Sequence, residues 1–235
     1  MPSSSLVPPS APYGDYMHVG TLLSLQRPPH VRAHPDELHF QATHQVIELL
    51  LACLVEDLGR AAAHVDHDDL LAAERMTGRA ALGVRIASSA LELLSTLTLA
   101  DYNLIRRELG RSSAAQSPGW HRTEATGRAL AAALDRYLAR HQLDLVAIVE
   151  HARPVDAHRL ITAVTDLDTA ISDWRWRHFN LAARLIGPGG SGTQGTALDV
   201  LARRAQSRLF GDVWKAYATV SARAGSAYGQ PEDRP

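Results

Sequence analysis

Residues 156–186 carry a long stretch of helical patterning, and this stretch constrains the fold most. Its apolar positions recur every three or four residues, so they share one face of a helix. The clearest part of that stripe consists of Ile171, Trp174, His178, Leu181 and Leu185. An imidazole in the middle of an apolar face is a buried polar group that needs a partner. The pattern therefore predicts one long helix with a histidine turned inward.

A second long helix, expected from about 36 to 63, repeats this arrangement. His44 shares a face with Phe40, Ile47 and Leu51. Each histidine has two interpretations: a core side chain bonded to a carbonyl or carboxylate, or a ligand of a metal or haem iron. Two inward-facing histidines on two long helices can build a site in the core of a helical bundle.

The rest of the chain also reads as helical. Further helices are expected at about 17–26, 66–97, 98–109, 121–140, 142–152 and, as two helices, 197–225. Leu145–Val149 is the only apolar run that resembles a strand. We predict an all-α fold with one domain over 13–225, a flexible arm at 1–12 and a disordered tail at 226–235.

Composition excludes several classes of protein. The chain has 235 residues, 46% of them hydrophobic, which is enough for one substantial core. A net charge of −1 without long runs of one sign favours neither nucleic acid nor an acidic membrane as a partner. No apolar run has the length of a membrane span, and no signal peptide opens the chain. A single cysteine, Cys53, fits a reducing cytoplasm and is expected to be a packed thiol. These features predict a cytoplasmic protein.

Two local motifs give only weak evidence for a binding site. The segment 187–192 matches G-x-G-x-x-G, but a helix rather than a strand precedes it, which argues against a dinucleotide site. It reads as a helix cap and connector, or as a loop whose N–H groups face an anion. His64 and His67, with the acids beside them, do not converge on one helix face and read as a solvated turn.

Four stretches in order resemble the tryptophan 2,3-dioxygenase superfamily of haem proteins. Tyr13–Gln26 is similar to the pattern Y-x-D-Y-L followed by L-L-S-x-Q, and Asp36–Leu49 to D-E-x-x-F followed by H-Q-x-x-E-L. Ser112–Ser117 is similar to S-S-G-F-Q-S, and Trp174–Gly187 to W-R-x-R-H followed by I-G. The matches span about 13–205, and the chain is short for the family, mainly between 124 and 155.

The resemblance implies a helical bundle with haem b in its core. His178 would be the proximal ligand of the haem iron, with Trp174 and Arg177 as further cofactor-binding residues. His44 would be the distal histidine that faces the substrate's indole N–H, and Phe40 would line the pocket beside it.

The resemblance of the N-terminal stretch, Tyr13–Gln26, also bears on the oligomeric state. Tyr13, Tyr16 and Met17 correspond to residues that close the site of a neighbouring subunit in the family. The chain would then be a homo-oligomer, a dimer or a tetramer.

Two departures concern the amino-acid end of the substrate. His121 stands where the family has the arginine that holds the substrate carboxylate, with Trp120 in place of the preceding aromatic residue. Arg122 could serve instead if the turn at 118–119 shifts the register. Thr193 would replace the threonine that contacts the substrate ammonium group.

The function implied is a haem-dependent oxygenase that inserts oxygen from dioxygen at the indole C2=C3 bond of L-tryptophan or a substituted tryptophan. Insertion of both atoms gives an N-formylkynurenine-like product. Two alternatives stay open: a monooxygenase that gives a 2-oxindole or hydroxylated amino acid, and a haem-binding protein without turnover.

Overall fold

The structure is a computed structural model that describes residues 12–110, 112, 116–187, 190, 195 and 197–228. Every secondary-structure element assigned in this part of the chain is a helix, which confirms the all-α prediction. In order these are α1 (Pro12–Tyr16), α2 (Val19–Ser24), the 3-10 helix η1 (Pro29–Val31), α3 (Glu37–Asp66), α4 (Leu70–Ala90), the 3-10 helix η2 (Leu91–Thr96), α5 (Leu99–Leu109), α6 (Pro118–Arg140), α7 (Leu145–His151), α8 (Val155–Ile186), α9 (Leu198–Gln206) and α10 (Gly211–Tyr228).

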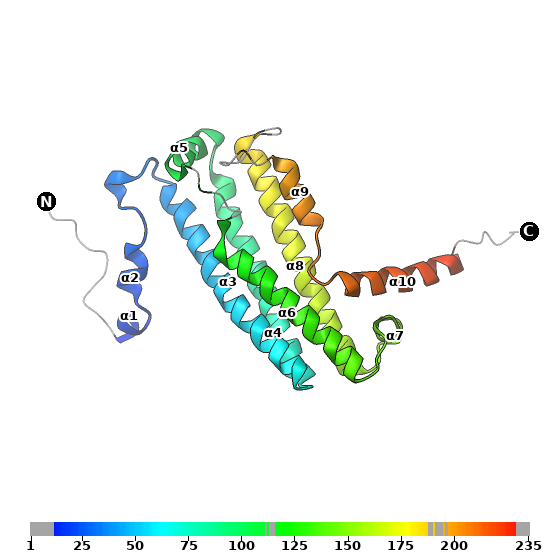
Figure 1. The fold of residues 1–235 in the computed structure, drawn as a ribbon. Coiled ribbons are helices and arrows are strands. Elements are labelled where there is room, and N and C mark those ends of the chain that lie inside the picture. The colour runs from blue at the N-terminus through cyan, green and yellow to red at the C-terminus, as the bar shows by residue number, and fades with distance from the viewer. Residues whose placement is uncertain are drawn as a thin grey trace, which may run out of the picture.

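Four long helices, α3, α4, α6 and α8, form the body of the molecule (Figure 1). α3 packs against both α4 and α6, and α4 also packs against α8. Each helix turns an apolar stripe inward, as amphipathic helices in a bundle do. The largest fully buried side chains are Leu51, Leu54, Leu58, Met76, Leu94, Ile105, Leu130, Ile148, Leu160, Ile161, Leu167 and Ile171. They belong to one continuous hydrophobic core.

The turn between α3 and α4 lies later in the chain than the sequence suggested. α3 continues to Asp66, and α4 begins only at Leu70. Asp68 adopts a positive φ of 61°, and Asp69 caps α4 by accepting a hydrogen bond from the N–H of Ala72. The predicted helix over 66–97 therefore starts later, and its last part is the 3-10 helix η2.

α5 folds back at the end of η2. Its axis is bent by 111° from the segment Leu70–Thr96. Thr98 begins the helix with a capping box, in which its hydroxyl accepts from the Asp101 N–H and the Asp101 carboxylate accepts from the Thr98 N–H. None of the described helices is by itself long and apolar enough to cross a membrane; only this bent pair meets that test, and only by length and composition.

A buried carboxylate on α8 fixes the start of α10. Asp168 is fully buried and accepts hydrogen bonds from three donors: the backbone N–H of Leu209 at 3.0 Å, that of Phe210 at 3.3 Å and the indole Nε1 of Trp214 at 2.8 Å. Three donors satisfy this otherwise costly buried charge. The connection between α9 and α10 is thereby held on the bundle.

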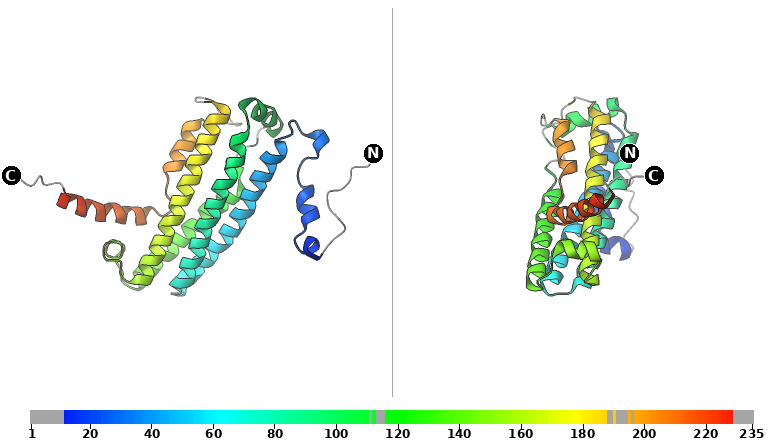
Figure 2. Two further views of the ribbon diagram at one scale, coloured as in Figure 1. Left: turned by 180° about the vertical axis from the view of Figure 1, so that it is seen from behind. Right: turned by 90° about the vertical axis from the view of Figure 1, so that its right-hand side faces the viewer.

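The two ends of the described chain lie on opposite sides of the bundle (Figures 1 and 2). α1 and α2 stand beside α3, and α10 extends away beyond α8 and contacts α7. α10 continues to Tyr228, into the range expected to be a disordered tail. Apart from Pro12, the expected flexible arm at 1–12 lies outside the described residues.

Three smaller predictions have clear outcomes. Leu145–Val149, the one strand-like run, is part of helix α7. Gly187 ends α8 with a φ of 81°, as expected for a helix cap. The expectation that Cys53 is packed was wrong, because the thiol lies on the outer face of α3, next to the buried Leu54, and is exposed.

Candidate active site

A cavity of about 500 Å³, here called the main cavity, opens at the end of the bundle where α3, η2, α5 and α8 meet. Its volume falls within the range of small-molecule and cofactor sites. The lining residues are Phe40, Gln41, His44, Gln45, Glu48, Leu91, Leu94, Tyr102, Leu109, Ser112, Gln116, Ser117, His178, Leu181, Ala182 and Leu185. Both histidines singled out from the sequence are among them.

His44 reaches the main cavity from α3 with its tautomer fixed by the backbone. Its Nδ1 lies 2.7 Å from the carbonyl oxygen of Phe40. A carbonyl can only accept, so Nδ1 carries the proton and Nε2 keeps its lone pair. Burial lowers the pKa of His44, although the bond to Phe40 and the charge of Glu48 oppose this shift. The imidazole is therefore neutral at pH 7.

His178 reaches the same cavity from α8 but has a different environment. Its ring stacks on Trp174, one helical turn earlier, with centroids 5.2 Å apart and an interplanar angle of 7°. Within the described residues, neither ring nitrogen has a hydrogen-bond partner. Burial, with a smaller contribution from nearby His44, lowers the pKa of His178 to about 4.

These properties bear on the two interpretations of His178. A core histidine is expected to bond to a carbonyl or carboxylate, as His44 does with Phe40. His178 instead presents a neutral ring with an unused lone pair to an open cavity, which is the state in which imidazole binds a metal or haem iron. The residues present therefore fit an iron ligand at this position.

The wall around His178 is largely apolar. Leu181 and Leu185 follow it on α8, and Leu91 and Leu94 line the cavity from η2. Such a wall suits a flat hydrophobic group and excludes water from it. None of the described lining residues is a lysine or an arginine, so this part of the chain offers no fixed cation inside the main cavity.

Behind His178 lies a second, smaller space of about 60 Å³, here called the side pocket. Trp120 and Trp174 meet there with ring centroids 4.2 Å apart. Arg175 borders it as well and donates to the carbonyl oxygens of Arg204 at 3.2 Å and Ser207 at 3.0 Å. These contacts hold the end of α9 against α8 beside the side pocket.

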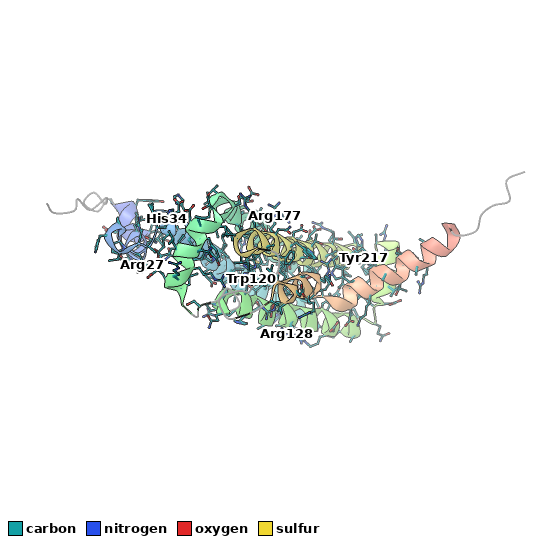
Figure 3. All side chains as sticks on the ribbon, turned by 90° about the horizontal axis from the view of Figure 1, so that it is seen from above. Arg27, His34, Trp120, Arg128, Arg177 and Tyr217 are labelled. Atoms are coloured by element: carbon teal, nitrogen blue, oxygen red, sulfur yellow. The ribbon has the colours of Figure 1, made fainter. Side chains whose placement is uncertain are left out.

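The residues expected to bind the substrate carboxylate do not line the main cavity. His121 lies in the first turn of α6, is exposed, and borders the side pocket. Arg122 is exposed and borders neither space. Arg177, expected near the cofactor, is exposed on α8 and forms an ion pair with Glu92 at 2.8 Å. Figure 3 shows Trp120 inside the bundle and Arg177 near its edge.

The N-terminal candidates lie outside the cavity of their own chain. Tyr13 and Tyr16 are 70% and 84% exposed on α1, and Met17 follows them at 49%. This exposure leaves them free for a contact with another subunit. Thr193 lies outside the described residues.

Several cavity residues escaped the sequence reasoning. Tyr102 comes from α5, where its ring lies 6.2 Å from that of Phe40, and burial raises its pKa. No local pattern signals that α5 folds back over α3. Gln45 and Glu48 belong to the stretch that resembles H-Q-x-x-E-L but were not predicted as site residues; their place one turn after Gln41 and His44 on the same helix could have indicated them.

The comparisons with known proteins identify the family of this chain. The sequence profile of the tryptophan 2,3-dioxygenase family matches residues 4–127. Among relatives named tryptophan 2,3-dioxygenase, the protein of Polaromonas sp. strain JS666 is 30% identical over 86% of this chain and 86% of its own length. The protein of Bordetella parapertussis is 29% identical, over 86% of this chain and 89% of its own. That of Xanthomonas oryzae pv. oryzae is 30% identical, over 84% and 85%. The chain therefore belongs to the tryptophan 2,3-dioxygenase family.

Proposed function

We propose that this protein is a haem-dependent oxygenase that inserts both atoms of dioxygen at the indole C2=C3 bond of L-tryptophan or a substituted tryptophan. The observation that carries the proposal is the pair of neutral imidazoles, His44 and His178, on one apolar cavity of about 500 Å³. The names of the relatives supply the reaction and the substrate.

In this proposal His178 holds the haem iron through a ring nitrogen. Haem, when bound, supplies the ferrous iron that binds and activates dioxygen. Trp174 orients the ligand by stacking, since no described carbonyl or carboxylate does so. Leu181 and Leu185, each on the α8 face that carries His178, keep water away from the reacting atoms.

His44 would act on the substrate side. Its Nδ1 is committed to Phe40, so Nε2 is the atom available to accept a hydrogen bond from the indole N–H. The indole N–H is a very weak acid, so the role of His44 is to orient the ring rather than to remove a proton. Phe40, whose ring centroid lies 4.3 Å from that of His44, would pack against the indole.

The amino-acid end of the substrate needs partners from outside the described lining. We assign the carboxylate to His121 or Arg122 and the ammonium group to Thr193, by their positions in the family pattern. Either α6 residue would have to turn from its present exposed position toward the main cavity. Arg177 would reach the cofactor only by giving up its ion pair with Glu92.

The assembly we propose is a homo-oligomer, a dimer or a tetramer. Tyr13, Tyr16 and Met17 would close the main cavity of a neighbouring subunit, which agrees with their exposure on α1.

Absorption spectroscopy tests the cofactor. Addition of haem to the purified protein should produce a Soret band, and His178→Ala should remove or shift it, whereas His44→Ala should retain it. A Soret band that is unchanged in His178→Ala would contradict the assignment.

Product analysis tests the reaction. A product that is heavier than tryptophan by two oxygen atoms supports ring cleavage, whereas a gain of one oxygen atom indicates a monooxygenase. If the haem-loaded protein consumes no dioxygen with tryptophan or its analogues, it is a haem-binding protein without turnover.

A further inference from the structure

Glu48 lies one helical turn beyond His44 on α3 and is the only acidic residue among the described lining of the main cavity. Its carboxylate is fully engaged with the start of α6. Oε1 accepts a short hydrogen bond from the hydroxyl of Ser117, and Oε2 accepts from the N–H of Gly119 at 3.0 Å. A single side chain therefore ties the helix of the distal histidine to the first turn of another helix.

The hydroxyl of Ser117 extends this connection along α6. While it donates to Glu48, its oxygen accepts a hydrogen bond from the N–H of Trp120 at 3.1 Å. Ser117 is thus the N-cap of α6, and its orientation is set by Glu48. The N-terminus of a helix carries partial positive charge, so a carboxylate is favoured at this place.

The backbone approaches Glu48 so closely that Gly119 has no room for a side chain. A Cβ atom there would lie 2.6 Å from Oε2 of Glu48 and 2.8 Å from Cβ of Leu51. Both neighbours belong to α3, so the two helices meet in direct contact at this point. The first turn of α6 cannot shift along α3 without breaking both hydrogen bonds to Glu48.

We propose that Glu48 is a positioning residue that fixes the first turn of α6, with Trp120 and His121, relative to His44. The inference rests on the proposed oxygenase function, because Ser117, at the start of this turn, lines the same cavity as His44 and His178. In this turn His121 is a candidate for the substrate carboxylate, whereas the ring of Trp120 is also held by its own contact with Trp174, with centroids 4.2 Å apart. Glu48 acts on substrate through this turn.

The contact pattern indicates which property Glu48 should control. Its two hydrogen bonds reach α6, and none is made to His178 or α8. Substrate affinity should therefore depend on Glu48, while haem binding and kcat should not. A loss of substrate affinity alone distinguishes a positioning role from a general loss of stability, because a general loss would lower the haem content as well.

The test compares Glu48→Gln with Glu56→Gln, a matched control in which the same change is made at an exposed position farther along α3. In glutamine one of the two carboxylate oxygens is replaced by an NH2 group, which cannot accept, so either the Ser117 hydroxyl or the Gly119 N–H loses the oxygen that accepts from it. We expect KM for tryptophan to rise about tenfold, the effect of one lost hydrogen bond to a charged acceptor. kcat should stay within about twofold of wild type, and the Soret band should be unchanged.

Hydrogen exchange of the haem-free protein gives a readout that does not depend on activity. In Glu48→Gln the amides of Gly119 and Trp120 should exchange about tenfold faster than in wild type, and in Glu56→Gln they should not. Ser117→Ala, which keeps the Gly119 contact, should accelerate only the Trp120 amide.

Two outcomes would overturn the inference. In one, Glu48→Gln matches Glu56→Gln in both KM and amide exchange. In the other, kcat or haem content falls while KM is unchanged. Should Glu48→Gln fail to fold, Ser117→Ala and Gly119→Ala take its place, and Gly119→Ala should raise KM because its methyl group displaces Glu48. If wild type binds haem but does not oxidise tryptophan, the proposed function fails, and amide exchange still decides the role of Glu48.

Discussion

Replacing Asp168 by alanine tests how the C-terminal helices are held on the bundle. The substitution removes a buried acceptor and leaves three donors without a partner: the N–H groups of Leu209 and Phe210 and the indole of Trp214. A hydrogen bond to a charged group contributes about 1.5–3 kcal/mol. The bonds at 2.8 and 3.0 Å have normal length, and the bond at 3.3 Å is weaker.

The three contributions do not simply add, because removing the carboxylate also removes the cost of burying it. We expect Asp168→Ala to lower the free energy of unfolding by about 3–5 kcal/mol. With a urea m-value of about 2 kcal/mol/M, the unfolding midpoint should fall by roughly 2 M. Far-UV circular dichroism during urea titration measures this shift through the loss of helix.

Asp166→Ala is the matched control, since this aspartate is exposed on the same helix. A surface change of this kind should alter stability by less than about 0.5 kcal/mol. If the two variants unfold at the same urea concentration, Asp168 does not anchor the α9–α10 connection.

Three further predictions concern the cavity and its supports. Without haem, the folded chain holds His178 neutral with a pKa of about 4, whereas the unfolded chain protonates it below about pH 6.5. The free energy of unfolding should therefore fall by about 3 kcal/mol as the pH drops from 6.5 to 4. In urea titrations His178→Leu should show a shallower pH dependence than wild type, and equal slopes would refute this. Arg175→Lys should lower the free energy of unfolding by about 1–3 kcal/mol, because lysine cannot reproduce the planar guanidinium that binds two carbonyls and Glu124. Hydrogen exchange should show faster opening of α9 than in wild type, and unchanged protection of α9 would contradict the role of Arg175. Thr98→Ala should cost about 1 kcal/mol by removing the cap of α5, and Thr98→Ser should restore most of it, as measured by thermal unfolding.

The two helices that carry His44 and His178 show what the local sequence pattern can predict. The spacing of apolar residues predicted helices over 36–63 and 156–186, and the structure has α3 and α8 at Glu37–Asp66 and Val155–Ile186. Ile171 and Leu185 are buried beside His178, as expected for one stripe. This success has a simple cause: the side chains that share a helix face are fixed by the helical repeat alone.

The helix ends were harder to predict from the sequence. The turn from α3 to α4 depends on a positive φ at Asp68 and on the cap at Asp69, whereas the sequence predicted a helix that begins at about 66. Acidic residues occur at both places, so composition alone does not separate the end of one helix from the beginning of the next.

By itself the sequence determined the helical class, the inward faces of His44 and His178, and the resemblance that made haem the expected partner of His178. Only the tertiary structure decided that Tyr102 lines the main cavity, that Glu48 joins α3 to α6, and that His121 borders the side pocket rather than the main cavity. The physical reason is that periodicity specifies which residues share a face, whereas the neighbour that covers the face depends on contacts between residues far apart in the chain. Glu48 and Gly119 illustrate this, because their hydrogen bond joins positions separated by 71 residues.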